Sequence, residues 1–260
     1  MAVRLTVEGA KALIVIDRPE VRNAMDYPAY EQLAAHWRRV RDDPAIRVAV
    51  ITGVGVSFCS GADLKNLIPR ITGDNAGRER PPGETSGNEA VLRENPIYKP
   101  IIAAVNGFCV ASGMEMLLGT DIRVASERAT FGLPEVCRGL FAAGGSTVRL
   151  PRQLPFVHAM DILLTGRRIT AQEALQMGLV NCVVPHEELM AKAMDYADLI
   201  VANSPNAVAR TKESVMRGRR MDEPSAFVLE KEMAAHVFGH TDAIEGPKAF
   251  LEKRPPAWSD

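Results

Sequence analysis

Short runs of apolar residues constrain the fold of this chain most strongly, because strands that are covered on both faces have this pattern. Residues 12–16 and 48–51 contain no polar side chain, and residues 101–105 and 122–125 repeat the signal. Residues 3–7 alternate apolar and polar side chains, as a strand with one exposed face does. The first half of the chain therefore predicts a sheet with buried inner strands.

Helical periodicity separates these runs and dominates later in the chain. Apolar residues recur at helical spacing in residues 30–40. From about Ser146 onward the pattern is nearly all helical, and Thr170 with Glu173 forms a capping box for a helix that ends at Gly178. Further amphipathic segments lie at residues 187–202, 206–216, 225–238 and 243–252. The sequence thus predicts an α/β layered core followed by a helical C-terminal part.

Composition and charge narrow the classes of function. The 260 residues are 47% hydrophobic and 24% charged, as in globular chains, and the net charge of −1 shows no basic excess for nucleic acid. The N-terminus lacks the pattern of a signal peptide, and no apolar stretch is long enough to span a bilayer, so no membrane role is predicted. The four cysteines have no paired or zinc-binding spacing, which favours a cytoplasmic location.

Cofactor and metal motifs are missing from the sequence. No G-x-G-x-x-G or phosphate-loop pattern indicates NAD or ATP. The five histidines have no partner at metal-binding spacing. Neither a metal nor a resident cofactor is predicted.

Residues 73–88 are rich in glycine, proline and charge and have no apolar period. Such a segment cannot offset its ordering entropy by burial. Because long loops in compact enzymes are often functional, we expect a mobile lid or pocket wall here.

Two glycine-containing turns follow predicted strands. Residues 58–64 come after the strand at 48–52, and residues 106–115 come after the strand at 101–105 and lead into a helix. Small residues allow a ligand to approach the main chain, and a helix start leaves N–H groups without intrahelical partners. Together the turns predict a pair of backbone donors for an oxyanion, although ordinary tight turns contain as much glycine.

The longer strings of the chain resemble the crotonase superfamily of enoyl-CoA hydratases and isomerases. The matching motifs occur in the family's order over residues 13–258. They are DRPEVRNAM (17–25), ITGVGVSFCSGADL (51–64), AAVNGFCVASGMEM (103–116), DIRVASERATFGLPEVCRGLFAAGGSTVRLPR (121–152), LLTGRRITAQEALQMGLVNCVV (163–184) and DAIEGPKAFLEKR (242–254). The resemblance implies a crotonase fold, with a spiral of ββα turns over residues 1–195. Residues 196–260 are then a helical region that assembles a homotrimer or homohexamer.

By this resemblance, the backbone N–H groups of Ala62 and Ser112 form an oxyanion hole, and Glu115 and Glu135 are the catalytic acids. Ser112 stands where the family commonly has glycine, which keeps the N–H but adds a hydroxyl near the pocket. Retention of both acids favours a hydratase, because isomerases and hydrolases of the superfamily often keep only one. The implied enzyme is a lyase, an enoyl-CoA hydratase that adds water reversibly, with syn geometry, to a 2-enoyl-CoA.

The chemistry depends on stabilising an enolate. A proton next to a thioester is too weakly acidic for a carboxylate to remove unless the enolate oxygen is bound, and each preorganised N–H contributes roughly 2.7–4 kcal/mol. In hydration, the resemblance implies that Glu115 deprotonates the water that attacks C3 and that Glu135 gives a proton to C2. One of the two acids is expected to be protonated, since close buried carboxylates resist ionising together.

The CoA moiety of the substrate is the only cofactor group that the resemblance implies. The residues implied for it are Arg22 along the pantetheine or diphosphate path, Ala62, Asp63, Leu64 and Lys65 near the adenine, and Phe250 and Lys253, from a neighbouring subunit, at the nucleotide end. Lys65 and Lys253 suit a phosphate chemically, although surface lysines are often only solvated.

Other functions stay open at this stage. The strings GRRITAQEAL and DAIEGPKAFLEKRPPAW resemble carnitinyl-CoA dehydratases, GTDIRVA and GGSTVRL resemble hydratases of bulky steroid-derived acyl chains, and an isomerase is a further alternative. Residues 210–220 are basic, as in an RNA-binding segment, but Glu213 interrupts them and no aromatic residue is interleaved, which favours a solvated helix face. A non-catalytic protein that has kept the fold also stays open, because Ser112 departs from the family's glycine. Retention of both acids argues against this alternative.

Overall fold

Two sheets form the core of the chain in the computed structural model, which describes residues 1–75 and 87–259. The 6-stranded sheet has the order β1-β2-β3-β5-β7-β10, and the 4-stranded sheet has the order β4-β6-β8-β9. The large sheet consists of β1 (Val3–Glu8), β2 (Lys11–Ile16), β3 (Val48–Gly53), β5 (Ile101–Val105), β7 (Ile122–Ser126) and β10 (Cys182–Val184). The small sheet consists of β4 (Ser57–Cys59), β6 (Phe108–Val110), β8 (Thr130–Gly132) and β9 (Arg168–Thr170). Each strand predicted in the first half of the chain is confirmed and lies in the large sheet.

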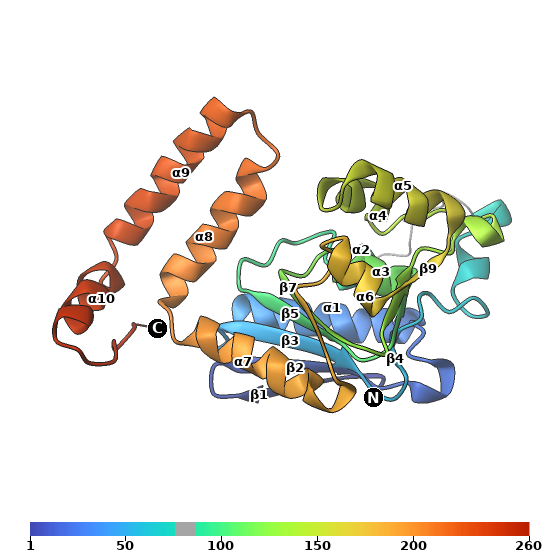
Figure 1. Ribbon diagram of the computed structural model, residues 1–260, viewed down its shortest axis with the longest axis horizontal. Coiled ribbons are helices and arrows are strands. Elements are labelled where there is room, and N and C mark those ends of the chain that lie inside the picture. Colours follow the sequence, from blue (N-terminus) through green and yellow to red (C-terminus); the bar gives the residue numbers. More distant parts are fainter. Residues whose placement is uncertain (76–86, 260) are drawn as a thin grey trace.

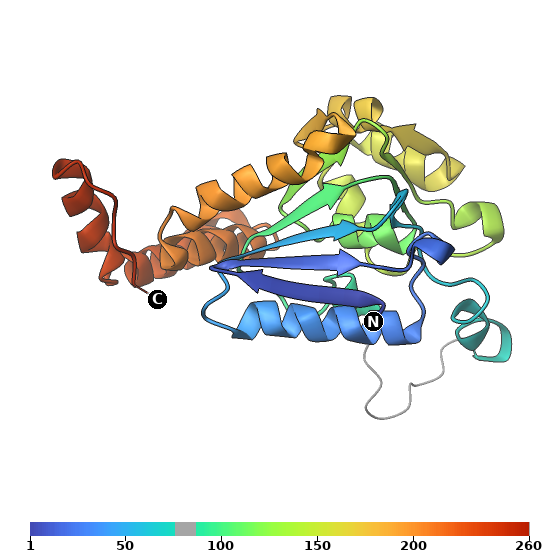
Figure 2. The ribbon, with the colours of Figure 1, turned by 90° about the horizontal axis from the view of Figure 1, so that it is seen from below.

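The large sheet is covered on both faces, as its apolar strands predict. β1 pairs antiparallel with β2, and the strands from β2 to β10 run parallel. Side chains alternate between the faces: Val48 and Val50 pack with α7 (Leu189–Val201), whereas Ala49 and Ile51 belong to the core shared with α1 (Tyr27–Asp42). Figure 2 shows α1 and α7 on opposite sides of this sheet.

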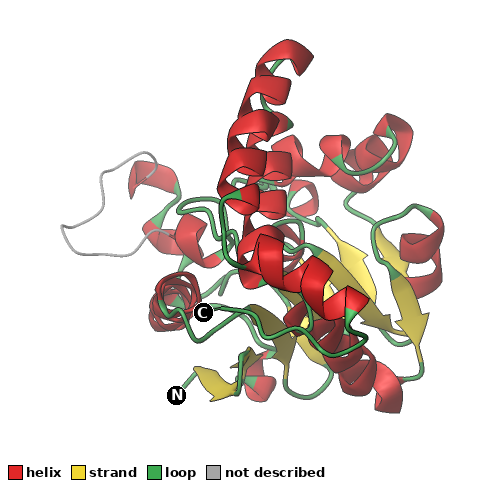
Figure 3. Cartoon of the chain, turned by 90° about the vertical axis from the view of Figure 1, so that its left-hand side faces the viewer, coloured by secondary structure: helices red, strands yellow, loops and turns green. Residues whose placement is uncertain are grey.

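The short strands of the small sheet follow strands of the large one. The chain runs directly from β3 to β4, from β5 to β6 and from β7 to β8, and β6 leads into α3 (Ser112–Leu117). β4, β6 and β8 are parallel neighbours, whereas β9 is antiparallel to β8. This succession of strand pairs and helices is the ββα repeat that the resemblance implies. Figure 3 shows the strands grouped together and flanked by helices.

Two strands correct the prediction that the chain is nearly all helical from about Ser146. β9 and β10 contain three residues each, which is too short for a periodic signal, yet β10 extends the large sheet beside β7. The helix between them, α6 (Ala171–Gln176), has the predicted capping box of Thr170 and Glu173, and Gly178 takes a φ of 78° beyond its end. The other helices of the core are α2 (Gly87–Ala90), α4 (Ser146–Arg149) and α5 (Phe156–Thr165).

Three helices follow the core: α8 (Pro205–Gly218), α9 (Glu223–Phe238) and α10 (Asp242–Leu251). Figure 1 shows the paired α8 and α9 projecting away from the sheets, with α10 beyond them. The predicted boundary at residue 195 falls inside α7, and α7 packs on the large sheet as far as Val201. The core therefore continues to the end of α7. Within the described residues, none of the helices has the length and apolarity of a membrane span.

The basic segment of the RNA alternative lies in α8, and several of its cations are paired within the chain. Glu213 is buried and contacts Arg210 at 2.5 Å and Arg217 at 2.8 Å. Lys212 contacts Asp121 at 2.6 Å. Because these charges are already compensated, the segment gives no support to a phosphate-binding surface.

The predicted lid, residues 73–88, falls mostly on residues outside the described part of the chain. Its described ends are a turn of 3-10 helix at Gly73–Asn75 and the start of α2. Asn75, Gly87 and Asn88 line the cavity described below, so both ends of the segment reach the candidate site.

Candidate active site

The predicted site residues follow three neighbouring strands of the small sheet. Ala62 comes after β4, Ser112 comes after β6, and Glu135 comes after β8. Because these strands are parallel, their carboxyl ends lie at one edge of the sheet, which is where open α/β sheets bind ligands. The small sheet therefore gathers residues that are far apart in the sequence.

The turns after β4 and β6 lie against each other. Gly61 has a φ of 107°, and a Cβ at this position would lie 2.7 Å from Ala111 Cβ and 3.7 Å from the Ser112 nitrogen. Glycine is thus required on both conformational and steric grounds. Ala111 itself has a φ of 52° and a ψ of −125°, an unusual conformation for a residue with a side chain, and it sets the direction in which α3 begins.

The two predicted oxyanion amides have no acceptor in the described part of the chain. Met25 N–H donates to Gly61 O at 2.8 Å, and Met25 O accepts from Asp63 N–H at 2.9 Å. These two hydrogen bonds flank Ala62 and do not use its N–H. Ser112 is the first residue of α3, where N–H groups have no intrahelical partner. Both N–H groups are therefore available to a ligand oxygen, and their oxyanion role stays a prediction.

Glu115 lies in the first turn of α3 and is buried, with 6% of its surface exposed. Its Oε1 accepts a hydrogen bond from Gly144 N–H at 2.5 Å. Burial raises the pKa of Glu115 to about 7; the Gly144 hydrogen bond opposes this rise, and the negative charge of Glu135 adds to it. A carboxyl with this pKa can both accept and donate a proton near neutral pH.

Glu135 follows Pro134 at the end of β8 and is half-buried. Its Oε2 is buried and has no hydrogen-bond partner among the described residues. Burial raises the pKa of this carboxyl as well, and the neighbouring Arg138 partly opposes the rise. A raised pKa increases the share of the protonated form, which is the form that can donate a proton.

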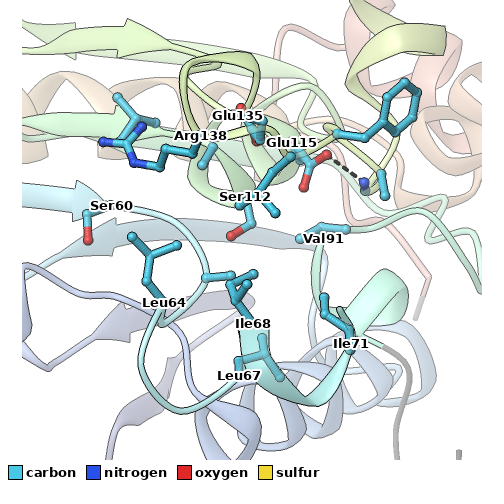
Figure 4. Close-up of a pocket in the computed structure, with 18 of the residues that line it drawn as sticks. Ser60, Leu64, Leu67, Ile68, Ile71, Val91, Ser112, Glu115, Glu135 and Arg138 are labelled. Atoms are coloured by element: carbon cyan, nitrogen blue, oxygen red, sulfur yellow. Dashed lines mark hydrogen bonds between the residues drawn. The ribbon is translucent and has the colours of Figure 1, made fainter. Parts of the chain in front are cut away.

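Both acids, together with Ala62 and Ser112, line one cavity of about 860 Å³. Figure 4 shows Glu115 and Glu135 on one side of it, Leu64 and Ile68 on the other, and Ser112 between them. Leu67, Ile71 and Val91 extend the apolar lining. The cavity thus joins an apolar wall to a polar reaction centre, as small-molecule sites commonly do.

The structure divides the residues predicted for CoA. Arg22, Ala62 and Leu64 line the cavity, whereas Asp63 and Lys65 do not belong to its lining. The Asp63 carboxylate instead accepts the N–H groups of Lys65 and Asn66 and the Asn66 side chain, which fixes the turn after β4. Asp63 therefore has a structural role that its sequence position did not indicate.

Phe250 and Lys253 are not brought to the cavity within one chain. Phe250 is 82% exposed on α10, and Lys253 follows that helix. Figure 1 shows α10 at one end of the molecule, well away from α2 and α3. Their predicted contact with the nucleotide stays a prediction that requires a second copy of the chain. Among the described residues, no group of three or more His, Cys, Asp or Glu side chains is placed to hold a metal ion.

Three residues at the cavity were missed by sequence reasoning. Gly144 positions Glu115, and Tyr30 donates its hydroxyl proton to Ser112 Oγ at 2.7 Å. Arg168 lies 5.6 Å from the ring centroid of Phe108, a ring that Arg22 also covers, at 5.8 Å. Tyr30 has the sequence signature of an ordinary core position, and the contacts of Gly144 and Arg168 depend on the fold.

The raised pKa of Glu115 predicts a stability that falls as pH rises. The carboxyl has a pKa of about 7 in the fold against an ordinary value of 4.5, so the folded chain binds more protons between these values. The contribution of Glu115 to the free energy of unfolding is complete below about pH 4.5 and is lost as pH rises through about 7. The loss amounts to roughly 3 kcal/mol. Glu115→Gln is therefore expected to unfold at higher urea concentration than wild type at about pH 8, and at a similar concentration near pH 5.

Urea unfolding at both pH values measures this difference. Glu187→Gln, a change at an exposed position, is the control and should follow wild type throughout. An equal advantage of Glu115→Gln at both pH values would contradict a raised pKa.

Comparison with known proteins supports the resemblance along nearly the whole chain. The sequence model of the enoyl-CoA hydratase/isomerase family matches residues 7–260. The chain belongs to this family. Within the enoyl-CoA hydratase/isomerase family, it is 42% identical to the enoyl-CoA hydratase EchA19 of Mycobacterium tuberculosis, over 95% of this chain and 92% of that protein. It is 38% identical to the carnitinyl-CoA dehydratase of Proteus mirabilis, over 99% of this chain and 98% of that protein.

Solved structures of the enoyl-CoA hydratase/isomerase family confirm the fold. The crystal structure of an enoyl-CoA hydratase/isomerase from Mycobacterium paratuberculosis is similar with a TM-score of 0.90 and 34% identity, over 100% of this chain and 98% of that chain. The predicted α/β crotonase fold is therefore confirmed. As a member of this family, the chain is a lyase that hydrates or dehydrates an acyl-CoA thioester.

Proposed function

We propose that this chain is an enoyl-CoA hydratase that adds water reversibly across the C2–C3 bond of a 2-enoyl-CoA. The proposal is carried by one observation: the buried Glu115 and the half-buried Glu135 line the same cavity as Ala62 and Ser112, whose amides are available. Hydration needs a base for water, an acid for C2 and donors for the enolate oxygen. This cavity contains a group for each of these tasks.

In the hydration direction, the amides of Ala62 and Ser112 donate to the thioester oxygen. Glu115, oriented by the Gly144 N–H, takes a proton from water while the water oxygen bonds to C3. The electron pair of the C2–C3 double bond moves through C1 to the thioester oxygen and forms an enolate. Glu135 then donates its proton to C2 as the carbonyl re-forms, and the product is a 3-hydroxyacyl-CoA. Dehydration follows the same path in reverse.

The lining of the cavity favours a neutral or anionic acyl group with a substantial apolar part. Leu67, Ile68 and Ile71 supply apolar contacts opposite the acids. The length of this apolar wall supports an extended or branched acyl chain.

Dehydration of a carnitinyl-CoA-like substrate is the second candidate, because a relative that is 38% identical carries that name. The same two acids serve the reverse direction. The carnitinyl group, however, bears a quaternary ammonium charge. Four arginines line the cavity, Arg22, Arg70, Arg138 and Arg168, and like charges disfavour a cationic acyl group.

Assembly and location complete the proposal. Phe227, Val228 and Phe238 on α9 are exposed, and such apolar side chains support burial in a homotrimer or homohexamer. That assembly would also allow α10 of one copy to approach the cavity of another. Light scattering of the purified chain tests the assembly. The cysteines of the described chain are unpaired, which supports a cytoplasmic location.

A panel of CoA thioesters tests the proposed activity. Crotonyl-CoA, a long straight 2-enoyl-CoA and a branched 2-enoyl-CoA are expected to lose their enoyl absorbance and yield 3-hydroxyacyl products, with the two larger substrates preferred in kcat/KM. Carnitinyl-CoA is expected to react more slowly. Isomerisation of a 3-enoyl-CoA without hydration of any 2-enoyl-CoA would contradict the proposal.

A further inference from the structure

Ser112 adds a hydroxyl group beside the amide that the proposed function uses, and Tyr30 holds this hydroxyl. Tyr30 lies on α1 and is 5% exposed, and its OH donates to Ser112 Oγ at 2.7 Å in a buried hydrogen bond. Both residues line the cavity. A helix on one side of the fold is thus connected to the first residue of α3 inside the candidate site.

The surroundings of Tyr30 keep its phenol protonated, so the phenol has a proton to donate. Burial raises the pKa of the Tyr30 phenol, and the nearby charges of Glu115 and Glu135 raise it further, so the phenol keeps its proton. That proton is donated to Ser112 Oγ. The Ser112 hydroxyl proton, in turn, has no acceptor among the described residues.

The free hydroxyl proton lies close to the predicted oxyanion position. The nitrogen and Oγ of one serine are separated by only two carbon atoms, so an oxygen that accepts from the Ser112 N–H is within reach of its O–H. Figure 4 shows Ser112 between the two acids and the apolar wall of Leu64 and Ile68, where a thioester must lie to meet both acids. A hydroxyl rotates freely unless a partner orients it. Tyr30 provides that partner.

We propose that the Ser112 hydroxyl is a third hydrogen-bond donor to the thioester oxygen, and that Tyr30 is the positioning residue that turns its proton into the cavity. The inference rests on the proposed function, because the oxygen belongs to the acyl-CoA substrate. A donor aimed at a developing negative charge binds the transition state more strongly than the substrate. The pair should therefore act on kcat more than on KM.

Substitutions that keep the backbone donors test this inference. Ser112→Ala retains the N–H and is expected to lower kcat for hydration of a 2-enoyl-CoA about 10-fold while changing KM less than about 2-fold. Tyr30→Phe should lower kcat by a smaller factor. The double variant should be no slower than Ser112→Ala, because the two side chains act as one unit. Tyr196→Phe, on α7 and away from the cavity, is the matched control.

Binding of acetoacetyl-CoA gives a readout that does not depend on turnover. Its enolate absorbs in the near ultraviolet, so the pH at which half of the bound ligand is enolised measures oxyanion stabilisation. Ser112→Ala is expected to raise this pH by about one unit relative to wild type, which is equivalent to the 10-fold loss of kcat. Tyr30→Phe is expected to raise it by a smaller amount. Saturable binding also shows that each variant is folded.

The outcomes separate this inference from the proposed function. Equal enolisation in wild type and Ser112→Ala would overturn the third donor even if the wild type hydrates 2-enoyl-CoA. A slower Tyr30→Phe with unchanged enolisation would overturn the positioning role. If Ser112→Ala raises the pH of enolisation relative to wild type but the wild type hydrates no 2-enoyl-CoA, the third donor is retained and the hydratase activity is rejected.

Discussion

Glu115→Gln and Glu135→Gln are each expected to lower kcat for 2-enoyl-CoA hydration by about 100- to 10,000-fold, the range of general acid–base catalysis. Glutamine matches glutamate in size, and its amide oxygen can still accept the Gly144 N–H that Glu115 Oε1 accepts at 2.5 Å. The substitutions therefore remove proton transfer and retain the shape of the cavity. Steady-state kinetics at saturating substrate measures the loss, and acyl-CoA affinity should change far less.

The pH profile distinguishes the two acids. Glu115 must be charged to accept a proton from water, so kcat/KM of the wild type should increase as pH rises through about 7, the pKa of this carboxyl. The rise of kcat/KM near pH 7 should be missing in Glu115→Gln. The double variant should lose little more than the slower single variant, because groups that act in one step are not additive. Glu187→Gln is again the control, and near wild-type turnover in either cavity variant would reject the assigned pair.

The elements that the sequence predicts well are those long enough to show a period. The strand at Ile101–Val105 is apolar throughout, and α1 places Leu33, Trp37 and Val40 on one buried face. The small sheet has strands of three residues, and its first two strands coincide with segments that look like glycine turns. Sequence reasoning thus found the layered core but missed the sheet whose parallel strands gather the site.

The site itself shows the same limit. Ala62, Ser112 and the two acids were located by family resemblance, because glycine content alone fits ordinary turns equally well. Their partners arise from tertiary contacts: Gly144 meets Glu115 across 29 positions and Tyr30 meets Ser112 across 82. No local period encodes such pairs.

Gly144→Ala is expected to lower kcat about 100-fold, because a displacement of about 1 Å in a catalytic group can have this effect. A Cβ at this position would lie 2.3 Å from Glu115 Oε2 and 2.6 Å from Glu115 Cδ, so the carboxylate must move away. The move also weakens the Gly144 hydrogen bond, which holds the pKa of Glu115 down against its burial. The ascending limb of the pH profile should therefore shift to higher pH.

Gly218→Ala in α8 is the matched control for this substitution. Its Cβ would lie 3.6 Å from Ala226 Cβ, an ordinary contact far from the cavity, so turnover should be unchanged. Thermal unfolding should show Gly144→Ala folded, since the change displaces one side chain at a cavity wall and leaves the sheets intact. If Gly144→Ala turns over at the wild-type rate with an unshifted pH profile, the position of the Glu115 carboxylate does not govern the reaction, and Glu115 is not the base.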